Sequence, residues 1–328
     1  MCIRDRVIIV LIIINIMATI KPISGMSNPR FADVATFFRL PIIKDLKNLD
    51  YCICGVPWDG GTTNRAGARH GPREIRNASS LIRTYHPVSL KSPYDKYNVA
   101  DIGDCPVNPA NLEDSLDKIK NFYSNILSSK TIPLSIGGDH LVSLPILRAL
   151  AKDKPLALFQ FDSHSDTWDS YFGGYKYTHG TPFRRAIEEN LIDPKKYVIV
   201  GIRGGLYDPN DLTWAKQQGV TIITIDDFYK MGMEEVMSIV KDTIGDTEAY
   251  LTFDIDGIDP THAPGTGTPE VGGFNVRESQ QIIRHLKNIN FVGADVVEVS
   301  PPFDINNMTS LVAATIAFEI LCTMTKSN

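Results

Sequence analysis

The sequence predicts an α/β protein of three layers, in which a mostly parallel sheet of about eight strands is covered by helices on both faces. Three observations support this prediction. Short apolar runs alternate along the chain with stretches of helical periodicity. The apolar runs lack polar alternation, as strands do when both of their faces are buried. No linker-like break divides the pattern, so we expect a single domain.

Seven apolar runs rich in β-branched and aromatic residues have the length of strands. Gly, Pro, Asp or Asn lies close to most of their ends, as turn chemistry requires. In chain order the strand candidates are Tyr51–Val56, Ile132–Ile136, Leu156–Phe161, Tyr197–Ile202, Val220–Ile225, Ala249–Phe253 and Phe291–Val299.

The stretches between these runs place apolar residues three and four positions apart, as amphipathic helices do. Most of them follow a strand candidate directly, which gives the alternation that is typical of βαβ units. In chain order the helix candidates are Gly71–Thr84, Asn111–Ser128, Leu141–Ala151, Pro182–Glu189, Leu212–Gln218, Met233–Ile244, Arg277–Leu286 and Ser310–Thr323.

The composition is that of an ordinary globular protein, with 43% hydrophobic and 22% charged residues among 328 and a formal net charge of −5. The sequence has no long run of Lys or Arg, which argues against nucleic acid or an anionic membrane as the main partner. The five cysteines are odd in number and are scattered through apolar stretches. We therefore expect reduced thiols, most of them buried, and a cytoplasmic protein.

Residues 1–25 are expected to form an N-terminal extension, and residues 26–328 the single domain. Two arginines precede the apolar run Val7–Met17, which resembles a short signal-peptide core and is too short to span a bilayer. No small-residue cleavage site follows this run. We favour a segment outside the native coding sequence, with translation starting at Met17 or Met26. The alternatives are a disordered tail or an export signal.

Polar clusters follow three of the strand candidates. The first is Gly-Gly-Asp-His at 137–140, the second is Asp-Ser-His-Ser-Asp at 162–166, and the third begins Asp-Ile-Asp at 254–256. Open α/β sheets bind ligands beyond the carboxyl ends of their strands, and parallel strands bring these ends to one edge. We therefore expect the three clusters to meet at one edge of the sheet.

Six side chains in these clusters have the chemistry of metal ligands. Any one of them could be an ordinary helix cap or turn residue. Four carboxylates packed together, however, repel one another unless cations such as two divalent ions neutralise them. Mixed oxygen and nitrogen ligation without thiolate favours Mn²⁺, with Ni²⁺, Co²⁺ or Zn²⁺ possible. The six are His140, Asp162, His164, Asp166, Asp254 and Asp256.

These motifs resemble those of the ureohydrolases, the family of arginase and agmatinase. The resemblance extends from near Pro29 to the C-terminus and is closer to the agmatinase and guanidino-acid hydrolase branch than to arginase. The defining motifs lie at 137–140, 162–166 and 254–260, further matches at 67–76 and 297–302, and the matches that favour the branch at 177–186 and 263–270.

The resemblance implies an arginase-like fold and two metal ions per chain. Asp162 and Asp254 would bridge the ions. The first ion would be held by His140, Asp162, Asp166 and Asp254, and the second by Asp162, His164, Asp254 and Asp256.

The resemblance also implies catalytic roles for three side chains. Asp166 would orient a hydroxide between the ions, His179 would transfer protons, and Glu298 would accept hydrogen bonds from the substrate guanidinium. Ser163 and Thr252 depart from the family, which usually has Ala and Ser there, but both are small and neither change removes a ligand.

The implied chemistry is plausible for these residues without the family. A bound metal lowers the pKa of water from about 15.7 to about 7, which makes hydroxide available to attack an electron-poor guanidinium carbon. The departing amine then needs a proton, which a histidine can supply near neutral pH. We therefore expect a hydrolase that converts a guanidino compound to urea and an amine.

The segment Thr167–Tyr177 is rich in aromatic residues and contains a glycine pair, which favours a loop. As a hypothesis, this loop forms one wall of a substrate pocket. Trp168 and Tyr177 are then candidate substrate-binding residues, and Arg203 or Asn64 would meet a carboxylate at the far end of the substrate.

Several functions stay open at the level of sequence. The substrate could be agmatine, a guanidino acid such as 4-guanidinobutanoate or 3-guanidinopropanoate, or free guanidine, which would give urea and ammonia. A deacetylase-like amide hydrolase with one metal is another enzyme class on the same fold. A non-catalytic regulator is disfavoured because no ligand is lost.

The resemblance implies a homo-oligomer, either a trimer or a hexamer. Three further histidines lie outside the motifs. We expect His86 and His285 at the surface and His262 in a loop.

Overall fold

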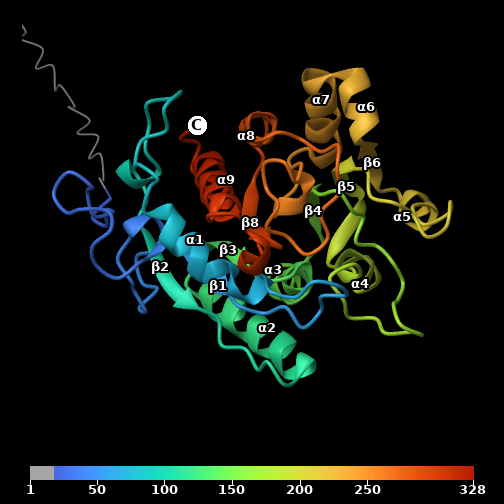
Figure 1. Ribbon diagram of the computed structural model, residues 1–328, viewed down its shortest axis with the longest axis horizontal. Coiled ribbons are helices and arrows are strands. Elements are labelled where there is room, and N and C mark those ends of the chain that lie inside the picture. Colours follow the sequence, from blue (N-terminus) through green and yellow to red (C-terminus); the bar gives the residue numbers. More distant parts are fainter. Residues whose placement is uncertain (1–17) are drawn as a thin grey trace, which may run out of the picture.

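The computed structural model describes residues 18–328, and its centre is one eight-stranded sheet (Figure 1). The strand order is β2-β1-β3-β8-β7-β4-β5-β6, and all neighbouring strands are parallel. The predicted α/β class with a mostly parallel sheet is confirmed. The strands are β1 (Tyr51–Val56), β2 (Val99–Asp104), β3 (Ile132–Gly137), β4 (Leu156–Phe161), β5 (Ile192–Ile202), β6 (Thr221–Thr224), β7 (Ala249–Asp254) and β8 (Phe291–Val297).

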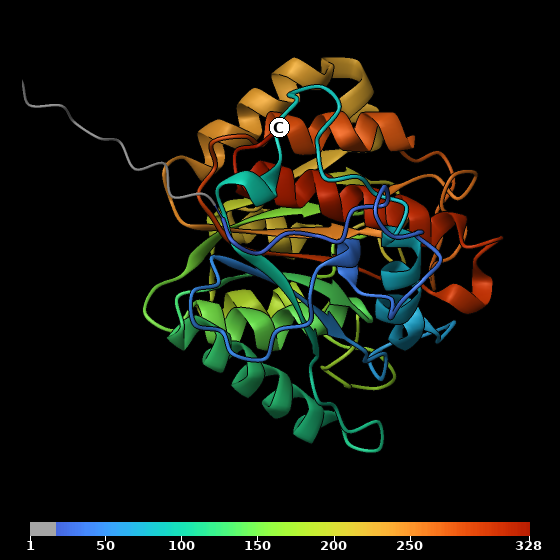
Figure 2. The ribbon, with the colours of Figure 1, turned by 90° about the vertical axis from the view of Figure 1, so that its left-hand side faces the viewer.

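Helices cover both faces of the sheet (Figures 1 and 2). One face carries α1 with α6 to α9, and the other carries α2 to α5. The helices are α1 (Gly71–Ser79), α2 (Leu112–Ser128), α3 (Ser143–Leu150), α4 (Pro182–Glu188), α5 (Thr213–Gln218), α6 (Ile225–Met231), α7 (Met233–Ile244), α8 (Val276–His285) and α9 (Met308–Met324).

The two faces of the sheet have separate hydrophobic cores. Along β1, Tyr51 and Ile53 belong to the core beneath α1 and α9, whereas Cys52 and Cys54 belong to the core beneath α2 and α3. This alternation is what a strand gives when apolar residues occupy both of its faces. The uniformly apolar runs in the sequence therefore mark buried parallel strands, as predicted.

Strand β2 was not predicted, because polar residues interrupt its apolar pattern. Its Asp101 is fully buried and accepts hydrogen bonds from the Arg76 guanidinium at 2.9 and 3.2 Å. A buried carboxylate is tolerated when a cation is paired with it. The ion pair lets an acidic residue occupy the edge strand, and it hides the strand from a search for apolar runs.

Helix α6 was also not predicted, and the strand candidate Val220–Ile225 overlaps it. The helix begins directly after β6, and Thr224 and Asp227 form a capping box in which each side chain accepts from the backbone of the other. A threonine followed three residues later by an acidic residue is a known helix start, so the sequence contained a sign of this boundary.

His86 was expected at the surface, and this prediction is wrong. The ring is buried and lies 3.1 Å from Glu319 on α9, whose carboxylate also accepts from Arg284 at 2.9 Å. His285 is partly exposed and lies 3.0 Å from Glu234, and His262 lies in an exposed loop. A polar residue outside a periodic segment looks exposed in sequence, because its buried partner lies far along the chain.

Of the predicted extension 1–25, residues 1–17 lie outside the described residues. The backbone N–H groups of Thr19 and Ile20 donate to Asn98 at 2.9 and 3.1 Å, so this part of the segment contacts the sheet domain. The boundary at residue 26 stays a prediction. Among residues 18–328, no helix combines the length and the apolar character needed to cross a membrane.

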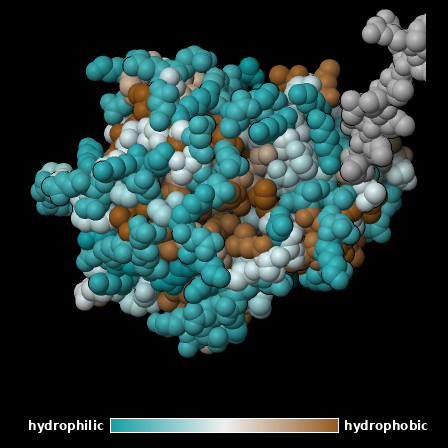
Figure 3. Space-filling model, turned by 180° about the vertical axis from the view of Figure 1, so that it is seen from behind, coloured by the Kyte–Doolittle hydropathy of each residue, from teal (hydrophilic) through white to brown (hydrophobic). Residues whose placement is uncertain are grey.

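Hydrophilic residues dominate the rear face of the molecule, where hydrophobic patches lie between them (Figure 3). Large apolar side chains are exposed in the N-terminal segment and in the loop after α1. Among them are Met26, Phe31, Val34, Val88 and Leu90.

Candidate metal centre

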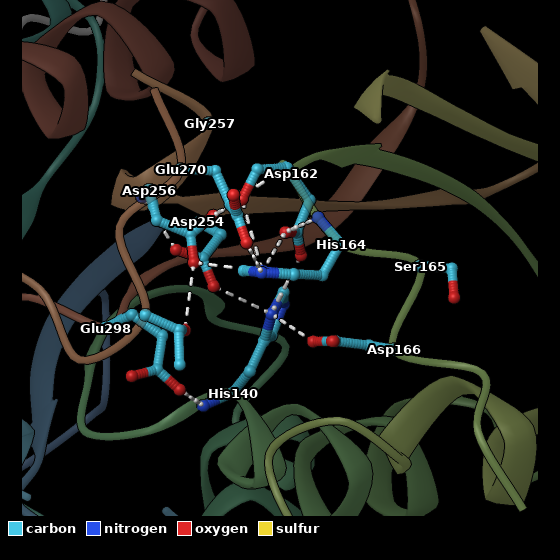
Figure 4. Close-up of polar contacts among 12 residues, drawn as sticks. His140, Asp162, His164, Ser165, Asp166, Asp254, Asp256, Gly257, Glu270 and Glu298 are labelled. Carbon is cyan, nitrogen blue, oxygen red and sulfur yellow. Dashed lines mark hydrogen bonds and ion pairs between the residues drawn. The ribbon is translucent and has the colours of Figure 1, made fainter. Parts of the chain in front are cut away.

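The three polar clusters meet at the carboxyl edge of the sheet, as predicted (Figure 4). Strands β3, β7 and β4 carry them, and β8 lies between β3 and β7 and delivers Glu298 to the same place. Glu298 and Asp166 have φ angles of 65° and 52°. Left-handed backbone at residues other than glycine is strained and is concentrated at functional sites.

The turn after β3 depends on a glycine that approaches another loop. A Cβ atom on Gly138 would lie 1.9 Å from the carbonyl oxygen of Trp58, so no larger residue fits there. The carbonyl of Gly138 accepts from the backbone N–H of Glu298 at 2.8 Å. The glycine pair thus makes a tight turn that brings His140 beside Glu298.

His140 lies at the centre of the first ligand group. Its Nδ1 atom is 3.2 Å from Asp162, 2.8 Å from Asp166 and 3.1 Å from Asp254, measured to one carboxylate oxygen of each. All four side chains are buried. This arrangement places one nitrogen and three oxygen ligand atoms around a common point.

The protonation of His140 follows from its other nitrogen. Thr252 Oγ1 donates to Asp295 at 2.6 Å, so the same oxygen must accept the hydrogen of His140 Nε2, 2.7 Å away. In the neutral imidazole, which is the form that binds a metal, Nδ1 then has the lone pair and no hydrogen. Three carboxylates face that lone pair, a set that repels itself unless a cation lies between them. The donors present therefore fit a divalent metal ion.

The second ligand group is made by Asp162, His164 and Asp256. The Nδ1 atom of His164 is 3.2 Å from Asp256 and 3.6 Å from Asp162, and its Nε2 atom is 3.6 Å from Glu270. A carboxylate beside Nε2 favours a hydrogen there and leaves Nδ1 free to bind a metal. Asp162 belongs to both groups, whereas Asp254 belongs only to the first, so bridging by Asp254 stays a prediction.

The pKa values of these acids reflect their crowding. Burial and the neighbouring carboxylates of Asp256 and Asp162 raise the pKa of Asp254 well above its usual value. Burial and Asp162 raise the pKa of Asp166 to about 6. Burial also acts on Asp162, but hydrogen bonds from His140 and His164 outweigh it and lower its pKa. Added positive charge, such as that of a metal ion, would therefore stabilise the ionised carboxylates of the site.

Glu298 and His179 form a pair next to the ligand groups. One oxygen of Glu298 accepts from the backbone N–H of His140 at 2.8 Å and from His179 Nδ1 at 2.9 Å. The other oxygen is buried and has no hydrogen-bond partner among residues 18–328. Although burial opposes it, the carboxylate of Glu298 raises the pKa of His179 to about 9.

A cavity of about 250 Å³ opens beside the ligand groups. Trp168, Tyr171 and Tyr207 line it with aromatic rings, which agrees with the hypothesis that the loop after Asp166 forms a wall. Thr63 and Asn64, from the loop after β1, line it as well.

Two tentative substrate-binding residues lie elsewhere. Tyr177 packs below Arg148, with the guanidinium 5.8 Å from the ring centre, and is absent from the cavity lining. Arg203 donates to the backbone oxygens of Asp256 and Glu270, both at 2.7 Å, and to that of Gly257 at 3.1 Å. Packing and backbone carbonyls already engage these two side chains, and a direct substrate role for either of them stays a prediction.

Sequence reasoning overlooked two residues of the site. Thr63 contacts His179 and Glu270 faces His164, and neither is in a cluster directly after a strand. Both lie in segments that carry the family match or adjoin it, but the pattern alone gives no reason to single out their side chains.

Comparison with known proteins identifies related chains. Residues 49–323 match the Arginase family. The guanidinopropionase of Pseudomonas aeruginosa is 52% identical over 94% of this chain and 96% of that protein, and the guanidinobutyrase of the same organism is 42% identical over 93% and 96%. The solved structure of proclavaminate amidino hydrolase from Streptomyces clavuligerus has a TM-score of 0.87 at 38% identity, covering 92% of this chain and all of that one.

Proposed function

The chain belongs to the arginase family, and we propose that within it the protein hydrolyses 3-guanidinopropanoate to urea and β-alanine. The reaction class, hydrolysis of a guanidino compound to urea and an amine, accords with the buried ligand cluster. One observation carries the hydrolytic chemistry. The Nδ1 atom of His140 faces three carboxylates, which repel one another unless a cation neutralises them.

The side chains around the metals would have different roles in the reaction. Two divalent ions, once bound, would supply a water molecule that ionises near neutral pH and can attack the guanidinium carbon. The free oxygen of Glu298 would accept a guanidinium N–H and hold that carbon in place. His179 would hold the proton that the departing amine needs.

The cavity supports an acidic substrate over agmatine. Agmatine has a second cation at its far end, which would need a free carboxylate. Glu270 is the one carboxylate outside the proposed ligand set in the lining of the cavity within residues 18–328, and it already faces His164. The amide of Asn64 and the hydroxyl of Tyr207 are neutral donors at the exposed side. They would bind a carboxylate that keeps part of its hydration.

The size of the cavity also favours a compact substrate. A volume of about 250 Å³ is below the range of about 300–1,000 Å³ that is typical of pockets for drug-sized ligands. The choice of the two-carbon spacer of 3-guanidinopropanoate over the longer chain of 4-guanidinobutanoate rests on the 52% identity to the guanidinopropionase of Pseudomonas aeruginosa.

A urea-release screen tests the proposal. Purified protein is loaded with Mn²⁺, Ni²⁺, Co²⁺ or Zn²⁺ and assayed with 3-guanidinopropanoate, 4-guanidinobutanoate, agmatine, arginine and guanidine. We expect the highest kcat/KM with 3-guanidinopropanoate. Asn64→Leu should lower kcat/KM for the two acids more than for agmatine. A preference for agmatine or guanidine would refute the substrate, and no urea from any pair would refute the function.

We propose Mn²⁺ as the metal, with Ni²⁺ and Co²⁺ as alternatives. Two imidazoles and four carboxylates offer nitrogen and hard oxygen donors without a thiolate, which suits Mn²⁺. Metal analysis of protein purified from its native source would identify the ion.

We also propose that the protein forms a homo-oligomer, either a trimer or a hexamer. Each chain would have one domain, which spans residues 26–328, and the protein would be cytoplasmic. Exposed apolar side chains such as Met26, Phe31 and Leu90 would be covered in an assembly. The four cysteines within residues 18–328 are free and buried, as in a reducing compartment. Mass measurement in solution tests the assembly, and a monomer would contradict it.

A further inference from the structure

Both ring nitrogens of His179 are already engaged in hydrogen bonds. Nδ1 lies 2.9 Å from Glu298, and Nε2 lies 2.8 Å from the hydroxyl oxygen of Thr63 and 3.2 Å from its backbone nitrogen. The residue is 7% exposed and, like Thr63, lines the cavity. In this arrangement His179 cannot touch a departing amine through either nitrogen without breaking one of these contacts.

The partners fix the direction of each hydrogen bond. An ionised Glu298 can only accept, so Nδ1 carries a hydrogen. The backbone N–H of Thr63 can only donate, so Nε2 presents its lone pair in the neutral ring. In the protonated ring, the hydrogen on Nε2 points instead to the hydroxyl oxygen of Thr63, the nearer of the two contacts at 2.8 Å. The Thr63 hydroxyl can donate and accept, and it is the only group at Nε2 within residues 18–328 able to do both. Thr63 also lines the cavity.

We propose that the hydroxyl of Thr63 relays the proton between His179 and the departing amine. This inference rests on the proposed hydrolysis of a guanidino compound, and it makes Thr63 a catalytic residue. His179 is then the proton reservoir behind the hydroxyl, and Thr63 is the group that meets the substrate nitrogen.

The bonds and hydrogens of this step balance. The bond between the guanidino carbon and the amine nitrogen breaks, and its electron pair goes to that nitrogen. The nitrogen takes the hydrogen of the Thr63 hydroxyl, and the hydroxyl oxygen takes a hydrogen from Nε2 of the protonated His179. Thr63 ends as it began, and His179 ends neutral, with its hydrogen on Nδ1 beside Glu298.

The loop that carries Thr63 is held on both sides. The backbone N–H of Gly61 donates to the buried carboxylate of Asp139 at 2.6 Å, and the carbonyl of Gly61 accepts from the backbone N–H of His179 at 2.9 Å. Asp59, itself buried, accepts from the backbone N–H of Gly67 at 2.8 Å where the loop ends. These contacts fix Thr63 relative to His179, which a relay requires.

Three variants test the relay. Thr63→Val removes the hydroxyl and keeps the branched shape, and Thr63→Ser restores the hydroxyl. Thr62→Val is the matched control, because the hydroxyl of Thr62 is buried and has no hydrogen-bond partner within residues 18–328.

We expect Thr63→Val to lower kcat by about 100-fold or more, since proton transfer by a positioned group contributes about 10²- to 10⁴-fold. Its KM, metal content and melting temperature should match those of the wild type, which a merely structural role would not leave unchanged. Thr63→Ser should retain most of kcat. A Thr63→Val kcat within twofold of wild type, or an equal loss in Thr63→Ser, would overturn the relay.

A spectroscopic measurement separates the relay from the proposed function. The ¹⁵N shifts of His179 are recorded in Zn²⁺-loaded protein, because Zn²⁺ is diamagnetic. The Nε2 resonance should move in Thr63→Val and stay in place in Thr62→Val. If it does not move in Thr63→Val, the contact and the relay are both wrong. Wild-type protein that releases no urea refutes the function instead, while the shifts still decide the contact.

Discussion

The imidazole of His140 is oriented by two hydrogen bonds that begin at Asp295. Asp295 is fully buried and accepts from Thr252 at 2.6 Å, from Ser143 at 2.6 Å and from Tyr250 at 2.8 Å. Three donors hold this carboxylate as an acceptor, which leaves Thr252 free to accept only from His140. Groups that do not touch a metal therefore decide which nitrogen of His140 can bind one.

Thr252→Val is expected to weaken metal binding by about 10- to 100-fold, the usual effect of losing an outer-shell partner. The change removes the acceptor of His140 Nε2–H, so the tautomer with its hydrogen on Nε2 is no longer favoured. Calorimetric titration with Mn²⁺ measures the effect. Thr252→Ser keeps the hydroxyl and should bind as the wild type does, and equal affinities in all three proteins would contradict the account.

Glu298→Gln should keep both metals and lower turnover. The amide oxygen can still accept from His140 and His179, which preserves the fold, but an NH₂ group replaces the free oxygen and points a donor at the guanidinium. A charge-assisted hydrogen bond contributes about 1.5–3 kcal/mol, so kcat/KM should fall by about 10- to 150-fold. Metal analysis and urea release, measured on the same preparation, check the two halves. Loss of metal together with activity would assign Glu298 to the metal site instead.

At the scale of single residues, the sequence reveals the candidate metal ligands but not the side-chain contacts between distant positions. The alternating Asp162, His164 and Asp166 could be recognised because their spacing follows from the geometry of an extended chain. The contact between Thr63 and His179 joins residues 116 positions apart, and no local pattern records it. The contacts of Tyr177 and Arg203 could not be foreseen for the same reason, since their partners are distant in sequence.

Strand ends and the loops after them form the next scale. The β3, β7, β4 and β8 ends meet because parallel strands share one carboxyl edge, so the site could be placed from the element pattern. Strand β2 and helix α6 could not be placed by apolar periodicity. An ion pair to Arg76 supports the first, and the second begins with no intervening turn after β6.

Arg203 joins two loops of the site by donating to backbone oxygens on both. Its guanidinium reaches Asp256 and Gly257 in the turn after β7, and Glu270 in the loop beside the cavity. Only an arginine offers enough donors in a fixed fork to satisfy these carbonyls together. Arg203 therefore holds the second ligand group in place.

Arg203→Met should lower metal content toward one ion per chain, because the loop that carries Asp256 loses its support while the first ligand group keeps its contacts. Arg277→Met, at an exposed position of α8, is the matched control and should leave metal content unchanged. Metal analysis after gel filtration measures both. Full metal content in Arg203→Met would show that the loops hold Asp256 without the arginine.

For the whole molecule, the ligand cluster makes stability depend on metal and on pH. In the metal-free state, burial raises the pKa of Asp166 to about 6 and that of Asp139 to about 8, against 3.8 for an ordinary Asp. The folded protein then holds protons that the unfolded chain has released. Stability must fall as pH rises through that window. The raised pKa values of His140 and His164 act with the same sign above pH 6.5.

We therefore expect the melting temperature of metal-free protein to fall between pH 5 and pH 8, about the range set by these shifts. With Mn²⁺ in excess the slope should reverse, because metal binding requires deprotonated ligands and stabilises the folded state by mass action. The lowered pKa of Asp162 acts only below pH 3.8 and leaves this window unaffected. Calorimetry at several pH values measures the melting temperature of the metal-free and the Mn²⁺-loaded protein. If both melting temperatures change with pH in the same direction, the account of a cluster that needs cations is contradicted.

The central claim is that two ions, one in each ligand group, are needed to release urea. The most direct test is to titrate metal-free protein with Mn²⁺ while bound metal and urea release from 3-guanidinopropanoate are measured in the same samples. Activity should stay low until the first equivalent is bound and rise as the second binds. His164→Ala and Asp256→Ala should stop near one ion per chain and release no urea. Full activity at one bound ion, in the wild type or in either variant, would contradict the account.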